Sequence, residues 1–439
     1  MDFRLSEEQQ MLQDTVARLV RAEYSFEQRM AHSASALGFS EAFWRRLGEL
    51  GLTAVPFPEA VGGFGGTGVE VMTVMTELGR GLCLEPYLQS VVLGGGLIQQ
   101  AGTDAQAARW LPEIAGGRTR VAVGLQEPQA FYDLNDVDTR AEAHGPGYRL
   151  NGRKAVVIGG HCADLLVVSA RTGGDRREPD GISLFLVAAD ARGVSRRSYP
   201  TIDGFRGCDL LLDDVEVGPE ALLGTAGKAA DTIEYQAGRA IAALCAEAVG
   251  VMEVACAQTL DYLKQRTQFG VPIGRFQVLQ HRMVDMMSEL EQARSMAILA
   301  ASVAEAPQDN ERRRVLAAAK NVIGRSGQFI AEQGIQSHGG IGMTWEYSFA
   351  HYAKRLVMIN HQLGDDDVHL ERYAALLQAG WAGQWRTGRR PRLPSSGAGR
   401  TLRRFRMQGT GPHAQGPRPR RDPCPHTLPA TPWPAPACC

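Results

Sequence analysis

Apolar side chains in the first part of the chain recur at helical spacing. Between residues 2 and 24, Leu12, Val16 and Val20 fall on one face, and Ser6 followed by two glutamates is typical of a helix start. The same period returns in later segments before residue 120. We therefore expect an α-helical domain over residues 1–120, with helices at 2–24, 43–50, 68–82 and 105–114.

After about residue 120 the apolar pattern shortens to the runs and alternations that β-strands show. Asn151-Gly152 and Gly173-Gly174 are turn signals between such runs. The pattern predicts a β-domain over residues 121–227, built as a small barrel or sandwich. Its strands are expected at 121–125, 163–169, 182–187 and 210–217.

Helical spacing returns beyond residue 227 in long segments, which predicts a helical bundle over residues 228–380 and an α+β multidomain fold. Carboxylates at Asp365, Asp366 and Asp367 suit the start of a last, short helix. One stripe in the middle segment is expected to be core; it consists of Leu279, Met283, Met286, Leu290, Ala293 and Ala297.

Length and composition are those of a globular, multidomain protein. The 439 residues, 44% of them hydrophobic, exceed what one core usually holds. Neither a basic and apolar leader nor a run of 18 apolar residues occurs, so we expect a cytoplasmic protein without a membrane span. Single cysteines in apolar segments predict reduced core thiols; they are Cys83, Cys162, Cys208, Cys245 and Cys256.

The C-terminal segment differs from the rest of the chain. From Gln384 onward it contains 11 arginines, 11 of the 22 prolines and a single acidic residue, with no apolar period. Such a composition buries too little surface to offset the entropy of ordering it. We expect a disordered Arg/Pro-rich tail over residues 381–439, either a non-native extension or an arm that binds nucleic acid or a partner. Nothing else in the sequence predicts nucleic-acid or metal binding.

Two separated motifs give the strongest functional signal. The first reads Arg266-Thr-Gln-Phe-Gly-Val-Pro-Ile-Gly-Arg-Phe-Gln277, and the second reads Gln336-Ser-His-Gly-Gly-Ile-Gly342. A fixed cation suits a pyrophosphate, and adjacent glycines let a ligand approach the backbone closely. In this order, behind helical and β-rich regions, they resemble the acyl-CoA dehydrogenase family over about residues 1–377. Residues 244–250 are most similar to the small subunit of pimeloyl-CoA-type dehydrogenases.

The resemblance implies an FAD held between two chains. One chain's β-domain and bundle hold the isoalloxazine and the acyl-CoA, while the neighbouring chain's two motifs hold the adenosine pyrophosphate half. The neighbour-facing set is complete in this chain and comprises Arg266, Gln268, Phe269, Gln277, Gln336, Gly339 and Gly340.

The set that serves the chain's own flavin is altered. Leu125, Gln126 and Ile158 match flavin-lining positions, but Ile158 replaces a hydroxyl residue of the family. In the loop 126–133 two family glycines and a flavin-facing serine have been replaced, and Val156 stands where the family has an aromatic wall. The loop replacements are Gln129, Phe131 and Tyr132.

The catalytic carboxylate of the family is also missing. Leu363 occupies its usual slot, and Gly238 occupies the alternative slot on the preceding long helix. Glu247, half-buried on that helix, is a substitute base, with a surface ion pair as the competing interpretation. His361 and the carboxylates at 365–367 are further candidates, the latter more typical of helix capping.

The residues and the resemblance together predict an FAD-dependent acyl-CoA dehydrogenase, acting as one subunit beside a homologous large subunit and passing electrons to electron-transfer flavoprotein or a similar acceptor. Three alternatives remain open. They are a non-catalytic structural subunit, a self-sufficient homotetramer with an unorthodox base, and a flavin monooxygenase on the same fold.

Overall fold

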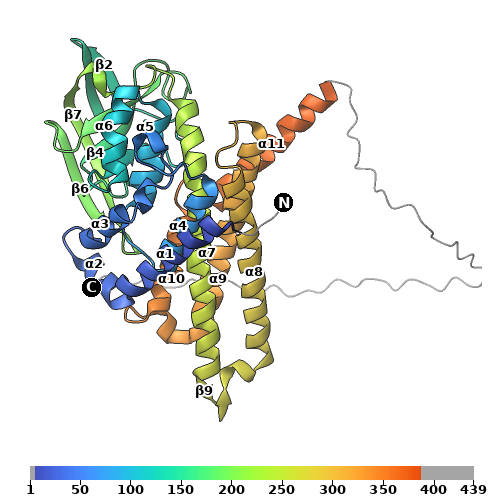
Figure 1. Cartoon of the computed structure of the whole chain (residues 1–439). Coiled ribbons are helices and arrows are strands. Elements are labelled where there is room, and N and C mark those ends of the chain that lie inside the picture. The colour runs from blue at the N-terminus through green and yellow to red at the C-terminus, as the bar shows by residue number, and fades with distance from the viewer. Residues whose placement is uncertain (1–4, 387–439) are drawn as a thin grey trace, which may run out of the picture. The chain divides into compact units, whose positions relative to one another are not determined.

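The computed structural model describes residues 5–386 (Figure 1). Helix α1 begins after Ser6, as the sequence predicts: the Ser6 hydroxyl accepts the Gln9 N–H at 3.2 Å, and the Gln9 side chain accepts the Ser6 N–H at 2.9 Å. The N-terminal helices are α1 Glu7–Glu23, α2 Phe26–Ala34, α3 Glu41–Glu49, α4 Gly68–Arg80, the π-helical η3 Leu88–Gly95, α5 Gly96–Ala101 and α6 Asp104–Ala115.

The middle region forms one sheet, in which the described residues contribute eight strands. Their order is β6-β7-β3-β2-β4-β5-β8, and β1 pairs with β4 in parallel. Along β4, Leu165 and Val167 join the main core while Leu166 and Val168 join a second core, which explains its unbroken apolar run. The strands are β1 Val121–Gly124, β2 Arg140–His144, β3 Gly147–Lys154, β4 Leu165–Arg171, β5 Ile182–Ala188, β6 Val194–Pro200, β7 Arg206–Val217 and β8 Leu222–Leu223.

The turn predicted at Asn151-Gly152 was wrong, because these residues lie inside β3 at a register shift against β7. The β2–β3 hairpin instead turns at Gly145, whose φ is +57°. A Cβ on Gly152 would lie 2.5 Å from the Thr139 hydroxyl, so this glycine serves close packing between strands. The predicted order of a helical, a β-rich and a second helical region is confirmed.

The C-terminal bundle packs on the N-terminal helices through α4 and α7. Gly79 and Gly250 permit this approach: a Cβ on Gly250 would lie 2.0 Å from the Thr76 carbonyl. By length and composition α7 could cross a membrane, but 83% of its most apolar window is buried within the protein, so it is a core helix. The bundle comprises α7 Ala230–Gln265, α8 Gln277–Ser302, α9 Asn310–His338, α10 Ser348–Asn360 and α11 Asp366–Arg386.

The end of the bundle departs from the predicted boundary. Helix α11, expected to be short, has 21 residues and continues past residue 380 to Arg386. The rest of the predicted tail, residues 387–439, lies outside the described residues. Within the described part of the chain the five core cysteines are buried and free.

Candidate functional site

The first motif forms an exposed hairpin at the end of α7. The chain leaves the helix after Gln265 and pairs β9 Thr267–Gln268 with β10 Val271–Pro272. Phe269 and Gly270 make the turn with φ of +55° and +79°, a conformation that a non-glycine residue adopts at some cost. The Phe269 side chain is 91% exposed, so the turn presents an aromatic ring to solvent rather than to its own core.

The second motif lies at the same end of the bundle. Tyr262, in the last turn of α7, packs on His338 at the end of α9 with ring centroids 4.6 Å apart. His338 also stacks on Phe349 at 4.4 Å, which fixes the backbone that follows. Gly339 comes next with a φ of +67°, and a Cβ on Gly339 or Gly340 would meet no atom within 4 Å. The two motifs, distant in sequence, therefore face solvent together.

This exposed surface is here called the donor surface. Arg266 is exposed, and no carboxylate within residues 5–386 pairs with it. A free guanidinium can form charge-assisted hydrogen bonds to a pyrophosphate, and the open glycines admit a ligand close to the backbone. The donor surface is made of Arg266, Gln268, Phe269, Gln277, Gln336, Gly339 and Gly340, all exposed.

A second feature is an apolar cavity of about 380 Å³ between the sheet and the bundle. The π-helical segment η3 supplies Leu88 and Leu93 to one wall, and Leu244 of α7 supplies another. Leu125, Gln126 and Ile158, the flavin-lining positions implied by the resemblance, all line it. Strained backbone clusters here: the positive-φ residues Phe131, Val156 and Leu363 all lie on its walls.

The loop 126–133 narrows this cavity. Phe131 and Tyr132 pack with ring centroids 4.4 Å apart, and the Tyr132 hydroxyl lies 3.2 Å from Nδ1 of His361 across the cavity mouth. Arg372 of α11 donates to the Tyr132 carbonyl at 3.1 Å. An isoalloxazine needs partners for its polar edge and room beside the loop. Ile158 and Val156 provide no side-chain partner for that edge, and Phe131, whose side chain is 73% exposed, lies on the wall of the cavity.

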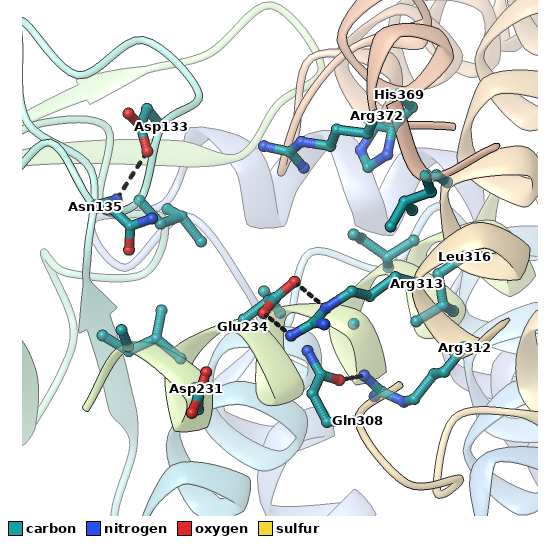
Figure 2. Close-up of a pocket in the computed structure, with 18 of the residues that line it drawn as sticks. Asp133, Asn135, Asp231, Glu234, Gln308, Arg312, Arg313, Leu316, His369 and Arg372 are labelled. Atoms are coloured by element: carbon teal, nitrogen blue, oxygen red, sulfur yellow. Dashed lines mark hydrogen bonds and ion pairs between the residues drawn. The ribbon is translucent and has the colours of Figure 1, made fainter. Parts of the chain in front are cut away.

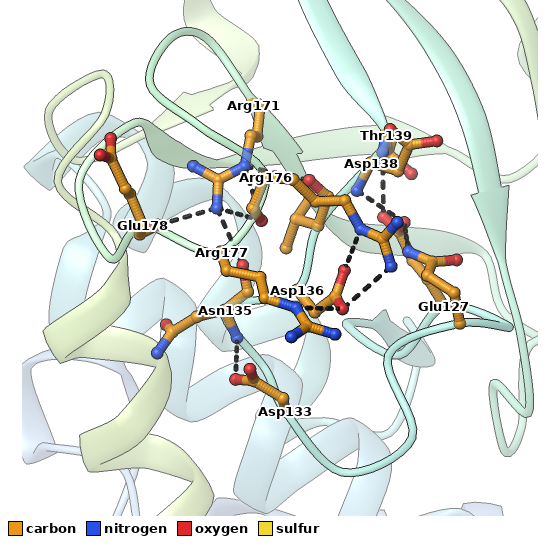
Figure 3. Close-up of polar contacts among 12 residues, drawn as sticks. Glu127, Asp133, Asn135, Asp136, Asp138, Thr139, Arg171, Arg176, Arg177 and Glu178 are labelled. Carbon is orange, nitrogen blue, oxygen red and sulfur yellow. Dashed lines mark hydrogen bonds and ion pairs between the residues drawn. The ribbon is translucent and has the colours of Figure 1, made fainter.

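Polar contacts hold this loop in place (Figure 3). Glu127 accepts N–H groups of Asp138 and Thr139 at 2.8 and 3.1 Å and the buried Lys154 ammonium at 2.6 Å. Burial raises the pKa of Glu127, but Lys154 outweighs burial and the net pKa is lowered. Burial lowers the pKa of Lys154 to about 8. The Glu127 carboxylate is therefore a structural anchor and is not free to take a substrate proton.

Arg171, at the end of β4, holds the segment that follows this loop (Figure 3). Its guanidinium donates to the carbonyls of Asn135, Val137 and Glu178 at 2.8, 3.0 and 2.8 Å. Asp136 is buried beneath Arg176 and Arg177 and pairs with both. These contacts fix residues 135–137, which follow the loop.

The second cavity, here called the polar cavity, contains the alternative base slot. It has a volume of about 500 Å³ and lies between α7, α9, α11 and the loop 133–135 (Figure 2). Gly238 lines it, and a Cβ there would lie 2.7 Å from Nη1 of Arg312. The Arg312 guanidinium, which donates to the carbonyls of Tyr235 and Ala304 at 2.9 Å each, thus occupies the space that a side chain at 238 would need.

Leu363 stands at the family's usual position for the catalytic base, and buried nitrogen donors fix the backbone around it. Leu363 has a φ of +59°, and its carbonyl accepts the His369 Nε2–H at 3.0 Å. Lys320 donates to the carbonyls of Asn360 and Gly364 at 2.8 and 2.7 Å. Burial, with Lys320 and Arg372 nearby, lowers the pKa of His369 to about 3, so the ring is neutral. No carboxylate of the described residues takes the place that Leu363 leaves.

Glu247 lies elsewhere, in an ion pair that is buried rather than on the surface. Both its oxygens accept from Arg355, at 2.6 and 2.8 Å, and Arg355 also donates to Asp203 at 2.8 Å. All three groups are buried, and Glu247 lines neither cavity. We therefore do not retain Glu247 as the base. The carboxylates of the 365–367 segment act locally: Asp365 accepts the Val368 N–H at 2.9 Å.

Comparisons with known proteins agree with this arrangement. Three family models match: the N-terminal, middle and C-terminal domains of acyl-CoA dehydrogenase, over residues 6–118, 122–215 and 233–377. The probable acyl-CoA dehydrogenase YngJ of Bacillus subtilis is 32% identical over 79% of this chain and 92% of its own length. The chain belongs to the acyl-CoA dehydrogenase family. Its cofactor is accordingly FAD, and it is an oxidoreductase that acts on CH–CH groups.

Solved structures of acyl-CoA dehydrogenase family members share the fold. A single-residue variant of the steroid ACAD Tcur3481-Tcur3483 matches with a TM-score of 0.77 and 31% identity over 86% of this chain and 99% of that one. The ChsE4-ChsE5 complex of Mycobacterium tuberculosis matches with a TM-score of 0.78 and 26% identity over 86% and 99%.

Sequence reasoning missed the buried polar residues that shape the two slots. Arg312, Lys320 and Arg355 lie on otherwise apolar helix faces, and His369 lies one turn into α11. The available signal was a charged residue recurring among buried positions, as at Lys320 behind Ala317 and Ala319. That signal marks a buried charge but does not identify its partner.

Proposed function

We propose that this chain is one subunit of a heteromeric, FAD-dependent acyl-CoA dehydrogenase, beside a homologous large subunit that carries the catalytic base. The observation that supports the proposal is an asymmetry between the two halves of the flavin site. The donor surface is complete and exposed, whereas the chain's own cavity is narrowed by Phe131 and Tyr132 and lacks a free carboxylate. This chain is therefore better equipped to complete the flavin site of a neighbouring subunit than to form a flavin site of its own.

FAD supplies the oxidising chemistry in such an enzyme by accepting the β-hydrogen of the acyl thioester. The residues of this chain bind and position it. Arg266 pairs with the pyrophosphate, Phe269 offers an apolar face, and Gly339 with Gly340 allows backbone N–H groups to approach. Each group is exposed at the same end of the bundle, as a ligand held by a second chain requires.

The chain's own cavity lacks a group placed to remove an α-proton. Among its described lining residues, the Glu127 carboxylate is taken up by Lys154, and His361 is exposed and bonded to Tyr132. The two slots of the family hold Leu363 and Gly238. The large subunit must therefore contribute the base.

One further observation supports a pair of unlike chains. Two of the solved structures to which this chain is similar, ChsE4-ChsE5 and Tcur3481-Tcur3483, have double names, and the first is described as a complex. The substrate in the proposal is an acyl-CoA, the electron acceptor an electron-transfer flavoprotein or similar protein, and the location the cytoplasm.

The proposal is tested by tagging the full-length chain in its native host and purifying it under mild conditions. We expect a homologous, longer chain to co-purify, and the flavin absorbance of the complex to bleach when octanoyl-CoA or a longer thioester is added. The chain expressed alone should be poor in flavin and should show no bleaching. An isolated chain that binds FAD and is bleached by a thioester would contradict the proposal.

A further inference from the structure

Helix α8 carries more apolar surface than the chain itself covers. The stripe from Met283 to Ala297 is buried against the rest of the bundle. Val284 and Met287 lie outside this stripe and are 63% and 41% exposed. Together with Leu260 of α7 they line a groove of about 840 Å³ between α7 and α8. Contiguous apolar surface of this kind is typical of a contact with another molecule.

The groove has a basic end and an acidic end. Lys264 and Arg275 border it where α7 ends and α8 begins, and both side chains are exposed. Glu291 borders it about four turns farther along α8. The Glu291 side chain meets Arg294 at 3.3 Å but remains 60% exposed. Opposite charges at the two ends make the groove complementary to a copy of itself that runs in the reverse direction.

A twofold axis beside Val284 produces this reversed fit. Two antiparallel α8 helices that cross there bring together residues equally far before and after Val284. Gln280, which lines the groove, then lies opposite Ser288 of the second copy, which also lines it. The Arg275 end of each groove lies beside Glu291 of the other copy, so both ends are neutralised at once. A parallel arrangement would instead place like charges together.

Other occupants match the two ends less well. From Gln384 onward the chain contains 11 arginines and one acidic residue, so this segment would suit Glu291 but would meet Lys264 and Arg275 with like charge. A fatty acid would cover the apolar floor and pair with Arg275, and it would leave Glu291 unmatched. Only the reversed copy supplies an anion at one end, a cation at the other and apolar side chains between them.

We propose that two copies of this chain bind each other through this groove, with their α8 helices antiparallel about a twofold axis at Val284. Each α8 then packs between α7 and α8 of the other copy. The contact leaves the donor surface free, because none of the seven donor-surface residues lines the groove. The inference goes beyond the proposed function and does not require it, since the contact joins like chains whether or not a large subunit is present.

Two cysteine variants on the same helix test the position of the axis. Val284→Cys and Val278→Cys start from valines that are 63% and 66% exposed. Both are made in the full-length chain, produced in its native host, with Cys424, Cys438 and Cys439 replaced by serine. A disulfide needs Cα atoms within about 7 Å of each other. The axis meets this condition at Val284, whereas two copies of Val278, six residues away, lie about 18 Å apart along the helices.

Mild oxidation of the purified protein should therefore link most Val284→Cys chains into a dimer of this chain, which a thiol reductant separates on a denaturing gel. Val278→Cys should give none. Equal yields from the two variants, no linked dimer from Val284→Cys, or a link from Val284→Cys to a different protein would overturn the inference.

Charge reversal tests the direction of the helices. In the Val284→Cys background, Arg275→Glu should lower the yield of linked dimer, because it places two carboxylates together at each end. Adding Glu291→Arg should restore most of the yield. A yield that Arg275→Glu leaves unchanged, or that Glu291→Arg does not restore, contradicts the antiparallel arrangement. A linked dimer that purifies without any large subunit supports this inference and contradicts the proposed function, so the two fail separately.

Discussion

Arg266 projects from the end of α7 with its guanidinium unpaired among the described residues, and this arrangement makes its contribution measurable. A hydrogen bond to a charged group contributes about 1.5–3 kcal/mol. Arg266→Ala should therefore weaken FAD binding to the complex by roughly ten- to a hundredfold, measured by fluorescence titration of the apo-complex. Arg314→Ala, on the surface of α9, is the control. Equal FAD affinity for the two variants would remove Arg266 from the flavin site.

Glu85 makes stability depend on pH. Its side chain is 4% exposed, Oε1 accepts the Ser40 N–H at 3.0 Å, and Oε2 has no partner among the described residues. Burial raises the pKa of Glu85 from 4.5 to about 7. The folded protein therefore keeps a proton that the unfolded chain releases, and the free energy of unfolding falls as pH rises from about 4.5 to 7.

A variant isolates this effect. Between pH 4.5 and 7 ionisation of the Glu85 carboxyl should lower the free energy of unfolding by on the order of 3 kcal/mol. Above pH 7 this loss of stability should stay constant. Glu85→Gln keeps the acceptor for Ser40 and cannot ionise, so it should be more stable than the parent at pH 8 and similar at pH 4.5 in urea unfolding. Glu59→Gln, on the surface, should show no such difference. A parallel pH dependence in parent and Glu85→Gln would show that Glu85 is not the source.

At the scale of elements, one buried triad joins three segments. Arg355 of α10 binds Glu247 of α7 and Asp203 in the loop before β7, and its guanidinium lies 4.4 Å from the Phe205 ring centroid. Breaking a buried pair by removing one partner typically costs about 3–5 kcal/mol, because the other charge stays buried. Arg355→Met should destabilise the protein by about that amount in urea unfolding.

Compensating variants identify the cause. Adding Glu247→Gln and Asp203→Asn to Arg355→Met should recover part of the loss, since no uncompensated carboxylate then remains. A loss below about 1 kcal/mol for Arg355→Met alone, or no recovery in the triple variant, would mean that the triad does not fasten α7, α10 and the loop.

The elements that sequence reasoning found are those with strong local signals. Ser6 capped α1 as expected, and the stripe from Met283 to Ala297 is buried in α8. The strands β2, β3 and β6 were missed because charged residues interrupt their apolar pattern, as at Arg196 and Arg197 of β6. For β3 the sequence also gives no sign of its partner, because β3 pairs with the distant β7. Asn151-Gly152 was misjudged because a turn signal and a close-packing glycine look alike in sequence.

For the candidate site, the sequence motifs identify which residues belong to the site, but they do not show which other side chains contact them. The chain pattern alone could show that Gly238 and Leu363 are not bases. It could not show that Arg312 fills the first slot, or that His369 and Lys320 hold the second, because these contacts join helices far apart in sequence. Glu247 looked half-buried by periodicity, and only the packing of α10 against α7 reveals the partner that engages it.

For the whole molecule, the central claim is that a flavin site is shared between this chain and an unlike one. The donor surface has every residue that the resemblance implies for one half of the site, whereas Phe131 and Tyr132 line the cavity in which the other half would lie. In an assembly of two such chains and two large subunits, each FAD needs one donor surface and one competent cavity. The number of flavins is then half the number of chains.

The most direct measurement is therefore the ratio of FAD to protein chains in the complex purified from the native host, obtained from native mass spectrometry and from flavin absorbance after denaturation. The account predicts one FAD per pair of unlike chains, and almost none on this chain purified alone. One FAD per chain, or a homotetramer of this chain that retains flavin, would contradict it.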